Sequence, residues 1–560
     1  MALNIQSCDK FLEEKLVSDV AGSTYYTTAA GLEDAVDATY SFLKWVYSNE
    51  RAYTLTVFGT DTYTNGADGN HKSFNYYDNG LNSSNDVMRE MWQNLYRGIN
   101  SANAVINRSQ AITDITPASL NIRLAEVRFL RALYYFNLVR QWGDVHLTLE
   151  ETIGAVVEAN KTSQATIYEK AIIPDLEFAI ANLPATQSNY GRATKPAAEH
   201  LLGLALLTRG YQSFAKSDDF SRAEQYFGNV ITGYNFSLVS DMVRLWDQSN
   251  TRNSEIVFAV QYSVDPILNG GEGNRGHLYF LMEYDIQPGM IRDIANGRPF
   301  KRFRPTDYLL NLWSADRDND KRYQDTYKHV WISNNATSIP KWTQANVDAG
   351  AKNKDGSPAV VGQNRYAVGD TAIYIPGPGR DAKWTATKKL QTRYRVYTRN
   401  EYSERIFAHI SKFIDPRRPA IQWEQGSRDW FVMRLGDTYL LRAEARFKQG
   451  NTAGAASDIN VVRTRAAFPG KAANMQITAA SVTMDFILDE RARELDAEQC
   501  RWYDLTRTGT LVSRVKLHNP LAAANIAAHH VRRPIPQIQI DRTLGGYVQN
   551  CGYPGGPACN

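Results

Sequence analysis

The chain has 560 residues, of which 43% are hydrophobic, and its 63 Lys and Arg nearly balance its 59 Asp and Glu. This composition excludes a disordered, fibrous or membrane-spanning protein. No run of five or six basic residues concentrates the formal net charge of +4, so we expect no nucleic-acid partner. The 31 Tyr and 11 Trp are more than a core of this size needs, and many lie among Gly, Asn and Asp. We therefore expect some of these rings to be exposed for binding.

Helical spacing dominates residues 32–235, which follow a lead-in segment of residues 1–31. Apolar residues recur there at steps of three and four, which predicts a run of paired helices. The broad apolar face from Arg123 to Trp142 predicts a long buried helix that ends at Gly143, where a residue with a free φ is favoured. We interpret residues 32–235 as the first part of a helical scaffold.

Two further segments have the internal similarity of tetratricopeptide-like helix pairs, in which small residues let two helices approach and bulky residues fill the gap. In residues 439–462, Tyr439, Gly450 and Ala455 fall at the aromatic, turn and small positions of such a repeat. Residues 220–230 match the second helix of the repeat. Two such segments among other paired helices predict an α-solenoid scaffold.

Between residues 236 and 428 the helical spacing breaks into short β-like pieces, separated by stretches rich in Gly, Asn, Asp and Pro. Irregular segments longer than about 15 residues are uncommon unless they bind something or are disordered, and the Trp content of this region argues against disorder. We interpret residues 236–428 as a loop-rich insert lobe with minor β structure. Residues 429–560 then complete the scaffold, which makes the fold mainly α.

The sequence carries no recognisable motif for catalysis or cofactor binding. It has no HExxH, paired CxxC, GxSxG, Walker or dinucleotide-binding motif, so we expect no cofactor, no metal and no catalytic residue. Glu490, Glu494 and Glu498 fall on one predicted helical face, close to Arg491 and Arg501. This spacing favours a structural ion-pair ladder over a catalytic pair.

Two other acidic arrangements bear on possible functional sites. Asp316, Asp318 and Asp320 alternate in a loop, but the Gly and terminal Glu of an EF-hand are missing. A solvated charged loop is therefore favoured over a calcium site, which stays open as the alternative. A glycoside hydrolase would need two carboxylates that face each other across a cleft, and no such pair is recognisable. We expect a protein that is not an enzyme.

Three of the four cysteines have specific interpretations. Cys551 and Cys559 bracket a Gly- and Pro-rich stretch, for which a small disulfide loop and two free thiols both stay open. Residues 5–8 (Ile-Gln-Ser-Cys) resemble the end of a bacterial lipoprotein signal, which would make Cys8 a lipidated N-terminus. An unmodified cysteine in a loose N-terminal segment is the alternative.

Five segments, in order along the chain, carry specific motifs: Trp92 to Asn103, Glu126 to Val145, Met433 to Ala445, an ER-EL-RW-DL block within Ile487 to Gly509, and a closing motif from Pro534 to Tyr553. In this order they are very similar to the motifs of the SusD/RagB-type outer-membrane lipoproteins of Bacteroidetes. The motifs are helical and core-forming, so they bear on the scaffold more than on the ligand.

This resemblance implies four tetratricopeptide-like units that support a variable lobe. It also implies a lipid anchor at Cys8, on the extracellular face of the outer membrane. The implied function is a non-catalytic one, in which the protein captures oligosaccharides or polysaccharides and delivers them to a SusC-like TonB-dependent transporter. A RagB-like peptide-binding protein in the same transporter role is the alternative.

Flat aromatic rings and amides are the groups that a glycan site needs, because sugar rings present apolar C–H faces and hydroxyl edges. Residues 61–79 and residues 313–384 combine such groups in predicted loops. From them we expect the following ligand-binding residues: Trp342, Tyr76, Tyr77, Trp331, Tyr63, Asn65, Asn79 and Trp313.

Overall fold

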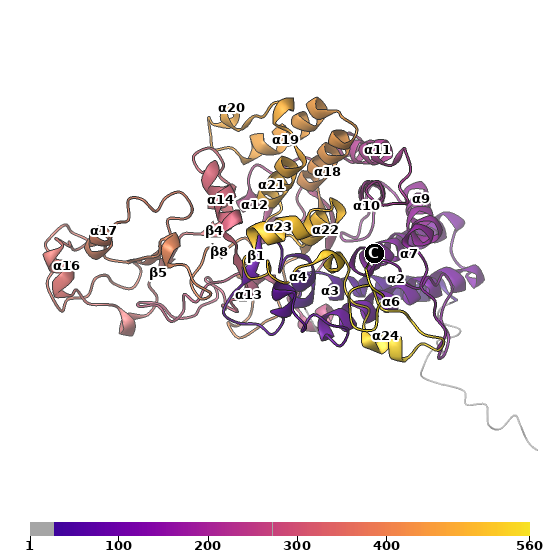
Figure 1. Ribbon diagram of the computed structural model, residues 1–560, viewed down its shortest axis with the longest axis horizontal. Coiled ribbons are helices and arrows are strands. Elements are labelled where there is room, and N and C mark those ends of the chain that lie inside the picture. The colour runs from indigo at the N-terminus through magenta and orange to yellow at the C-terminus, as the bar shows by residue number, and fades with distance from the viewer. Residues whose placement is uncertain (1–26, 271–272, 560) are drawn as a thin grey trace, which may run out of the picture.

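The computed structural model describes residues 27–270 and 273–559. Helices from both ends of the chain form one body, and the segment carrying β5 (Val330–Ile332), α16 (Gln344–Asp348) and α17 (Ala386–Gln391) projects from it to the left in Figure 1. The expected mainly α fold is confirmed. Within the described ranges, no helix combines the length and the apolar character that a membrane span requires. Cys8 lies outside the described residues.

The helices before the insert are α2 (Ala29–Ser41), α3 (Leu43–Val46), α4 (Glu50–Thr56), α5 (Ser73–Tyr76), α6 (Asp86–Arg108), α7 (Pro117–Trp142), α8 (Gln164–Ile167), α9 (Ile173–Asn182), α10 (Lys195–Arg209) and α11 (Asp219–Thr232). Those within it, besides α16 and α17, are α12 (Met242–Leu245), α13 (Gly276–Tyr279), α14 (Asp307–Ala315) and α15 (Arg322–Thr326). Those after it are α18 (Leu435–Lys448), α19 (Thr452–Ala466), α20 (Ala472–Met475), α21 (Met484–Glu494), α22 (Arg501–Arg507), α23 (Leu511–His518) and α24 (Gln537–Asp541).

The long helix predicted from the apolar face lies at the centre of the body. α7 begins after Thr116, whose side chain accepts a hydrogen bond from the backbone N–H of Ser119, and Pro117 occupies its first turn. It ends at Gly143, whose φ of 78° lies in the region that favours glycine. Nearly every residue from Ala125 onward is buried, because α6 and α9 pack against this helix. The predicted helix and its end are confirmed.

Paired helices form the rest of the body, as the two repeat-like segments predict. α10 packs against α11, α18 packs against α19, and α11 contacts α18, which joins the two halves of the scaffold. Gly203 lets one pair approach closely, since a Cβ there would lie 2.8 Å from the ring of Phe227. Small residues at these contacts therefore set the spacing between helices, and Phe227 fills the space.

Short strands mark where the chain leaves the body and returns to it. β2 (Ile256–Val260) pairs antiparallel with β9 (Trp430–Arg434), so the two ends of the insert lie side by side. β1 (Tyr63–Asn65) pairs with β3 (Phe303–Pro305), and β4 (Tyr327–Lys328) pairs with β8 (His409–Ile410). β5, β6 (Thr371–Tyr374) and β7 (Arg395–Val396) form a three-stranded sheet in the projecting part. That part has its own buried cluster, which includes Met282, Trp331, Ile373 and Phe407.

Glu490 and Glu494 of α21 are buried among cations, as the expected ion-pair ladder predicts. Glu490 accepts from Arg322 at 2.8 Å and Glu494 accepts from Arg434 at 2.7 Å. Glu498 pairs with Arg434 as well, but it lies beyond the end of the helix. The left-handed Ala497, with φ 61°, breaks the helical steps of four before Glu498 is reached.

The two arginines expected beside the ladder have other partners. Arg491 pairs with Asp504 at 2.9 Å, and Arg501 pairs with Asp61 at 2.6 Å. Burial alone would raise the pKa of Glu494, but the charges of the surrounding arginines outweigh that effect and lower it to about 2. Glu494 is therefore ionised in the folded protein at neutral pH.

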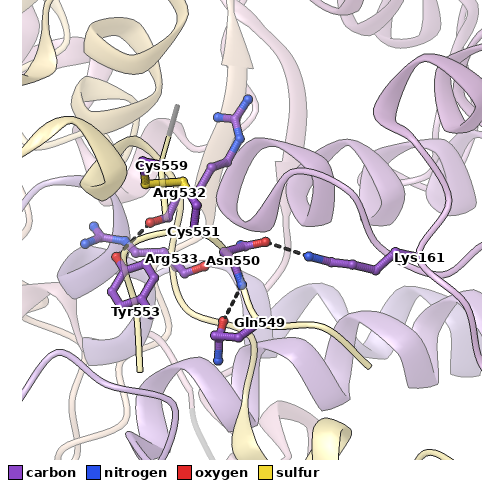
Figure 2. The surroundings of a disulfide bond; sticks show 8 residues. All are labelled: Lys161, Arg532, Arg533, Gln549, Asn550, Cys551, Tyr553 and Cys559. Carbon is purple, nitrogen blue, oxygen red and sulfur yellow. Dashed lines mark hydrogen bonds between the residues drawn. A yellow bond between two sulfur atoms is a disulfide. The ribbon is translucent and has the colours of Figure 1, made fainter. Parts of the chain in front are cut away.

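A disulfide closes a small loop in the C-terminal segment (Figure 2). Cys551 and Cys559 are bonded, with their Cα atoms 5.0 Å apart, which settles the alternative that the sequence left open. Beside the bond, the amide of Asn550 donates to the carbonyl oxygen of Trp142 and accepts from Lys161, each at 2.8 Å. The closing motif thus caps the central helix of the body.

Replacing Arg322 should destabilise the fold strongly, because Arg322→Gln leaves Glu490 and Glu494 buried with fewer counter-charges. We expect the free energy of unfolding in urea at pH 7 to fall by about 3–5 kcal/mol. Arg89→Gln is the control, since its pair with Asp86 is largely exposed, and it should cost less than about 1 kcal/mol. Equal losses in the two variants would contradict the role assigned to the buried network.

Histidine burial predicts a loss of stability in mild acid. Burial lowers the pKa of His146, which stacks on Tyr96 at 3.8 Å, from 6.5 to about 4, and it lowers that of His200 to about 4 as well. Below pH 6.5 the unfolded chain therefore binds protons that the folded chain takes up only near pH 4, so the free energy of unfolding should fall through this window. Because the pKa of Glu494 is lowered to about 2, the free energy of unfolding should fall further between pH 4.5 and 2. Urea unfolding at several pH values measures this free energy.

The variant His146→Asn should show a shallower decrease between pH 6.5 and 4 than the unmodified protein. The difference in slope, rather than the stability at pH 7, is the informative quantity, because the variant also loses the stacking on Tyr96. An identical slope in the two proteins would show that His146 does not titrate in this way.

Candidate functional site

Trp342, the leading ligand-binding expectation, lies in a small core of its own. Its side chain is 1% exposed and packs with Ala351 and Ala359. The indole N–H donates to the side-chain oxygen of Asn353 at 3.0 Å, and Arg365 covers the ring. A loop-packing role accounts for this Trp, and its ring presents no free face to a ligand.

Other expected rings are also buried in this structure. Trp331 belongs to the core of the projecting part, with its ring against His409, and Trp313 packs against Tyr327 in the main core. The hydroxyl of Tyr63 donates to Asp496 at 2.7 Å, and the same carboxylate accepts from Tyr327. Tyr63 and Trp313 therefore meet around Tyr327 as interior packing and do not form a binding platform.

The first candidate segment, residues 61–79, divides between interior and surface. Asn65 is fully buried in β1. Tyr77 has a left-handed φ of 51° that turns its ring inward, and its hydroxyl donates to the carbonyl oxygen of Gly59 at 2.8 Å. Tyr76 is half-buried and Asn79 is exposed. Of the eight expected residues, only these two are accessible to a ligand.

An open cleft of about 880 Å³ lies where the projecting part meets the start of α14. It is lined by Asp307, Asp381, Ala382, Trp384, Ala386, Lys389, Thr398, Arg399, Asn400 and Glu401. Trp384 is half-buried, with its ring centroid 5.5 Å from that of Tyr374, which in turn lies 6.1 Å from Tyr394. The cleft therefore combines an accessible indole, backed by two tyrosines, with polar and charged groups.

Local capping interactions hold the polar groups of the cleft. Thr398 and Glu401 form a capping box, in which the Glu401 carboxylate accepts from the backbone N–H of Thr398 at 2.9 Å. Lys389 of α17 and Arg395 of β7 donate to the same carboxylate. Although burial opposes it, these donors lower the pKa of Glu401. Glu401 is thus a fixed anion that ties α17 to the strand beside it.

Arg399 links the other wall of the cleft to the body. Its guanidinium donates to Asp307 at 2.8 Å and to Asn311 at 2.7 Å, both on α14. Its backbone N–H donates to Asp381, whose pKa is raised chiefly by burial. The charged side chains of the cleft are held largely by one another, while Asn400 is exposed and Trp384 is partly exposed.

A second cleft, of about 690 Å³, lies between α2 and the loop of residues 188–192. The hydroxyls of its two tyrosines already donate within the protein: Tyr40 donates to Glu126, and Tyr190 donates to the carbonyl oxygen of Thr251. The guanidinium of Arg252 covers the Tyr190 ring. The cleft around Trp384, which alone of the two contains a Trp, is therefore the better candidate.

Sequence reasoning placed Trp384 at the end of an aromatic-rich segment but did not single it out. The residues that follow Trp384 could have indicated its exposure. Trp384 directly precedes Thr385, which caps the N-terminus of α17, and that helix has no buried residue. A Trp beside a helix without an apolar face has little core to enter. This signal separates Trp384 from Trp331 and Trp313.

The alternating acidic loop is held by ion pairs with arginine. Asp316 pairs with Arg463 at 2.9 Å, Asp320 pairs with Arg322 at 2.6 Å, and Asp318 pairs with Arg380. These partners account for the three carboxylates. Across the described part of the chain, no group of three or more His, Cys, Asp or Glu side chains is placed to hold a metal ion.

Comparison with known proteins agrees with this architecture. A family model described as SusD family matches residues 247–553, and one described as starch-binding associating with outer membrane matches residues 10–211. The SusD-like protein P25 of Formosa agariphila is 25% identical, over 96% of this chain and 95% of its own length. The starch-binding protein SusD of Bacteroides thetaiotaomicron is 24% identical, over 81% of this chain and 76% of its own.

Among solved structures, a laminarin binding SusD-like protein is similar in fold, with a TM-score of 0.67 and 21% identity over 94% of this chain and 100% of that one. The five sequence motifs lie in the helical body and not in the projecting part. Since the first family model covers more than half of the chain, the protein belongs to the SusD family, the SusD/RagB family of Bacteroidetes.

Proposed function

We propose that this protein captures oligosaccharides or polysaccharides and that the cleft around Trp384 holds them. The observation that carries the proposal is the accessible indole at an open polar cleft. The names of relatives support the ligand class, since one is a starch-binding protein and another is laminarin binding. The chain's own residues supply the reason for choosing this cleft.

The chemistry of the cleft suits a sugar. The apolar C–H face of a pyranose ring stacks on an indole, while its hydroxyls need donors and acceptors at the edge. Trp384 would supply the face, and Asn400 and Lys389, which also line the cleft, would supply the polar groups. Because Glu401 and the Thr398 capping box hold Lys389 in place, little ordering of the protein is needed on binding.

We also propose that the bound glycan is not hydrolysed. Hydrolysis requires one carboxyl group that protonates the leaving group and a second that is free to act as base or nucleophile. Glu401 accepts hydrogen bonds from four donors on Lys389, Arg395 and Thr398, and Asp307 is paired with Arg399. Asp381 therefore has no second free carboxylate beside it in the cleft. The absence of new reducing ends after incubation with a bound glycan would agree with this.

The cellular role follows from the family and stays a proposal. We propose that Cys8 carries the lipid anchor at the outer membrane and that the protein delivers its ligand to a SusC-like TonB-dependent transporter. A family model described as associating with the outer membrane supports the location. Release of a Cys8→Ala variant from membranes tests the anchor, and co-purification of the transporter from outer membranes tests the partnership.

Replacing Trp384 should abolish most of the affinity. In affinity electrophoresis against plant, algal, fungal and host polysaccharides, Trp384→Ala should weaken retardation about tenfold or more, because a stacked indole contributes around 2 kcal/mol at a binding centre. Trp423→Ala is the matched control, since Trp423 is 38% exposed but does not line the cleft. Unchanged retardation of Trp384→Ala would place the site elsewhere, with Tyr76→Ala and Asn79→Ala as the next variants.

Replacing Trp342 should act on the fold instead of on the ligand. Trp342→Ala removes a buried ring and should lower the free energy of unfolding by about 3–5 kcal/mol. The folded fraction should keep its affinity for the glycan, as measured by calorimetry below the unfolding temperature. Loss of binding with unchanged stability would restore Trp342 as a ligand residue, and retardation by no glycan at all would favour a peptide ligand.

A further inference from the structure

The cleft around Trp384 has more acidic than basic residues in its lining. Its charged lining residues are Asp307, Asp381, Glu401, Lys389 and Arg399. Three carboxylates thus stand against two cations. The charges of these five side chains, and which of them already have partners, decide what kind of ligand the cleft can accept.

Both cations of the lining already pair with carboxylates of the lining. Lys389 donates to Glu401, and Arg399 pairs with Asp307 at 2.8 Å. Glu401 also accepts from Arg395, which does not line the cleft. Among the described residues that line the cleft, no cation is therefore left without a carboxylate partner.

Asp381 is the lining acid whose charge is not compensated. Its carboxylate accepts a hydrogen bond from the backbone N–H of Arg399 at 3.2 Å, and it makes no ion pair with any described residue. Asp381 is half-buried, and its carbonyl oxygen accepts from the backbone N–H of Trp384 at 2.8 Å. The unpaired carboxylate therefore belongs to the same turn as the ring that we propose stacks on the sugar.

Two exposed lysines of the same segment do not change this balance. The ammonium group of Lys383 lies 5.5 Å from the ring centroid of Trp384, and Lys388 belongs to α17. Neither of them lines the cleft. In this structure, an anionic group held inside the cleft would therefore gain no ion pair from the lining.

We infer that the cleft takes an uncharged glycan and that Asp381 excludes glycans bearing carboxylate or sulfate groups. This inference rests on the proposed glycan-binding function and adds its ligand class. An anionic group would lose hydration without gaining a cation, and it would meet the carboxylate of Asp381. The hydroxyls of a neutral sugar meet no such repulsion. Selectivity of this kind comes from an unfavourable contact with the wrong ligand.

Affinity electrophoresis with probes of known charge tests the inference. The neutral probes are soluble starch, laminarin, galactomannan and xyloglucan, and the anionic probes are polygalacturonate and λ-carrageenan. We expect at least one neutral probe to retard the protein and both anionic probes to retard it about tenfold less. Retardation by the neutral glycan should stay the same between about 20 and 300 mM NaCl, because no ion pair with the ligand is there to be screened.

The carboxymethyl derivative of the neutral glycan that binds is the matched probe, since it has the same backbone and differs in charge. In Asp381→Asn, the preference for the neutral glycan over this derivative should fall about threefold, because the amide removes the charge and can still accept from Arg399. Asp348→Asn is the control variant, in which the preference should not change. Asp348 is exposed in the projecting part, accepts from Gln344 at 2.8 Å and does not line the cleft.

Three outcomes would overturn the inference while sparing the proposed function: retardation by an anionic probe as strong as that by any neutral one, equal retardation by the neutral glycan and its carboxymethyl derivative, or the same preference in Asp381→Asn as in the unmodified protein. In each of these outcomes, retardation would still be lost in Trp384→Ala. Retardation by no glycan of either class would instead contradict the proposed function.

Discussion

Buried ion pairs between arginine and glutamate hold the insert against the helical body. Arg322 comes from α15 in the insert and Arg434 from the strand that closes it, and both meet Glu494 of α21. Leaving one member of such a set unpaired costs several kcal/mol, so an arrangement that separated the insert from the scaffold would be strongly penalised. The network thereby ties α15 of the insert, and the strand that follows the insert, to α21 of the helical body.

The cleft itself depends on weaker and more local contacts. A capping box, two shared ion pairs at Glu401 and the link from Arg399 to α14 position its walls. None of these needs a deep core, which agrees with the exposure of α17. A site made of short loops can thus vary in sequence while the helical body below it stays the same.

The predicted ligand residues show that a sequence pattern cannot separate buried from accessible aromatic side chains. Trp331 and Trp384 both lie among polar residues, yet one is fully buried against His409 and the other lines the cleft. Their burial differs because Trp331 lies on the buried face of β5, whose side chains alternate between core and solvent. Trp384 precedes α17, a helix that has no buried residue. Burial is set by what other segments of the chain bring to the ring, and Trp is buried in most proteins.

The sequence by itself determined the helical scaffold, the end of α7 at Gly143, the repeat-like pairs and the family, because these follow from spacing within single segments and from an ordered set of motifs. It also located the carboxylates of the buried network, though not their partners. The folded structure was needed to show which aromatics are accessible, which arginine meets which glutamate, and that Cys551 and Cys559 are bonded. Those outcomes join residues that are distant in sequence or depend on backbone geometry, and pattern along the chain does not encode them.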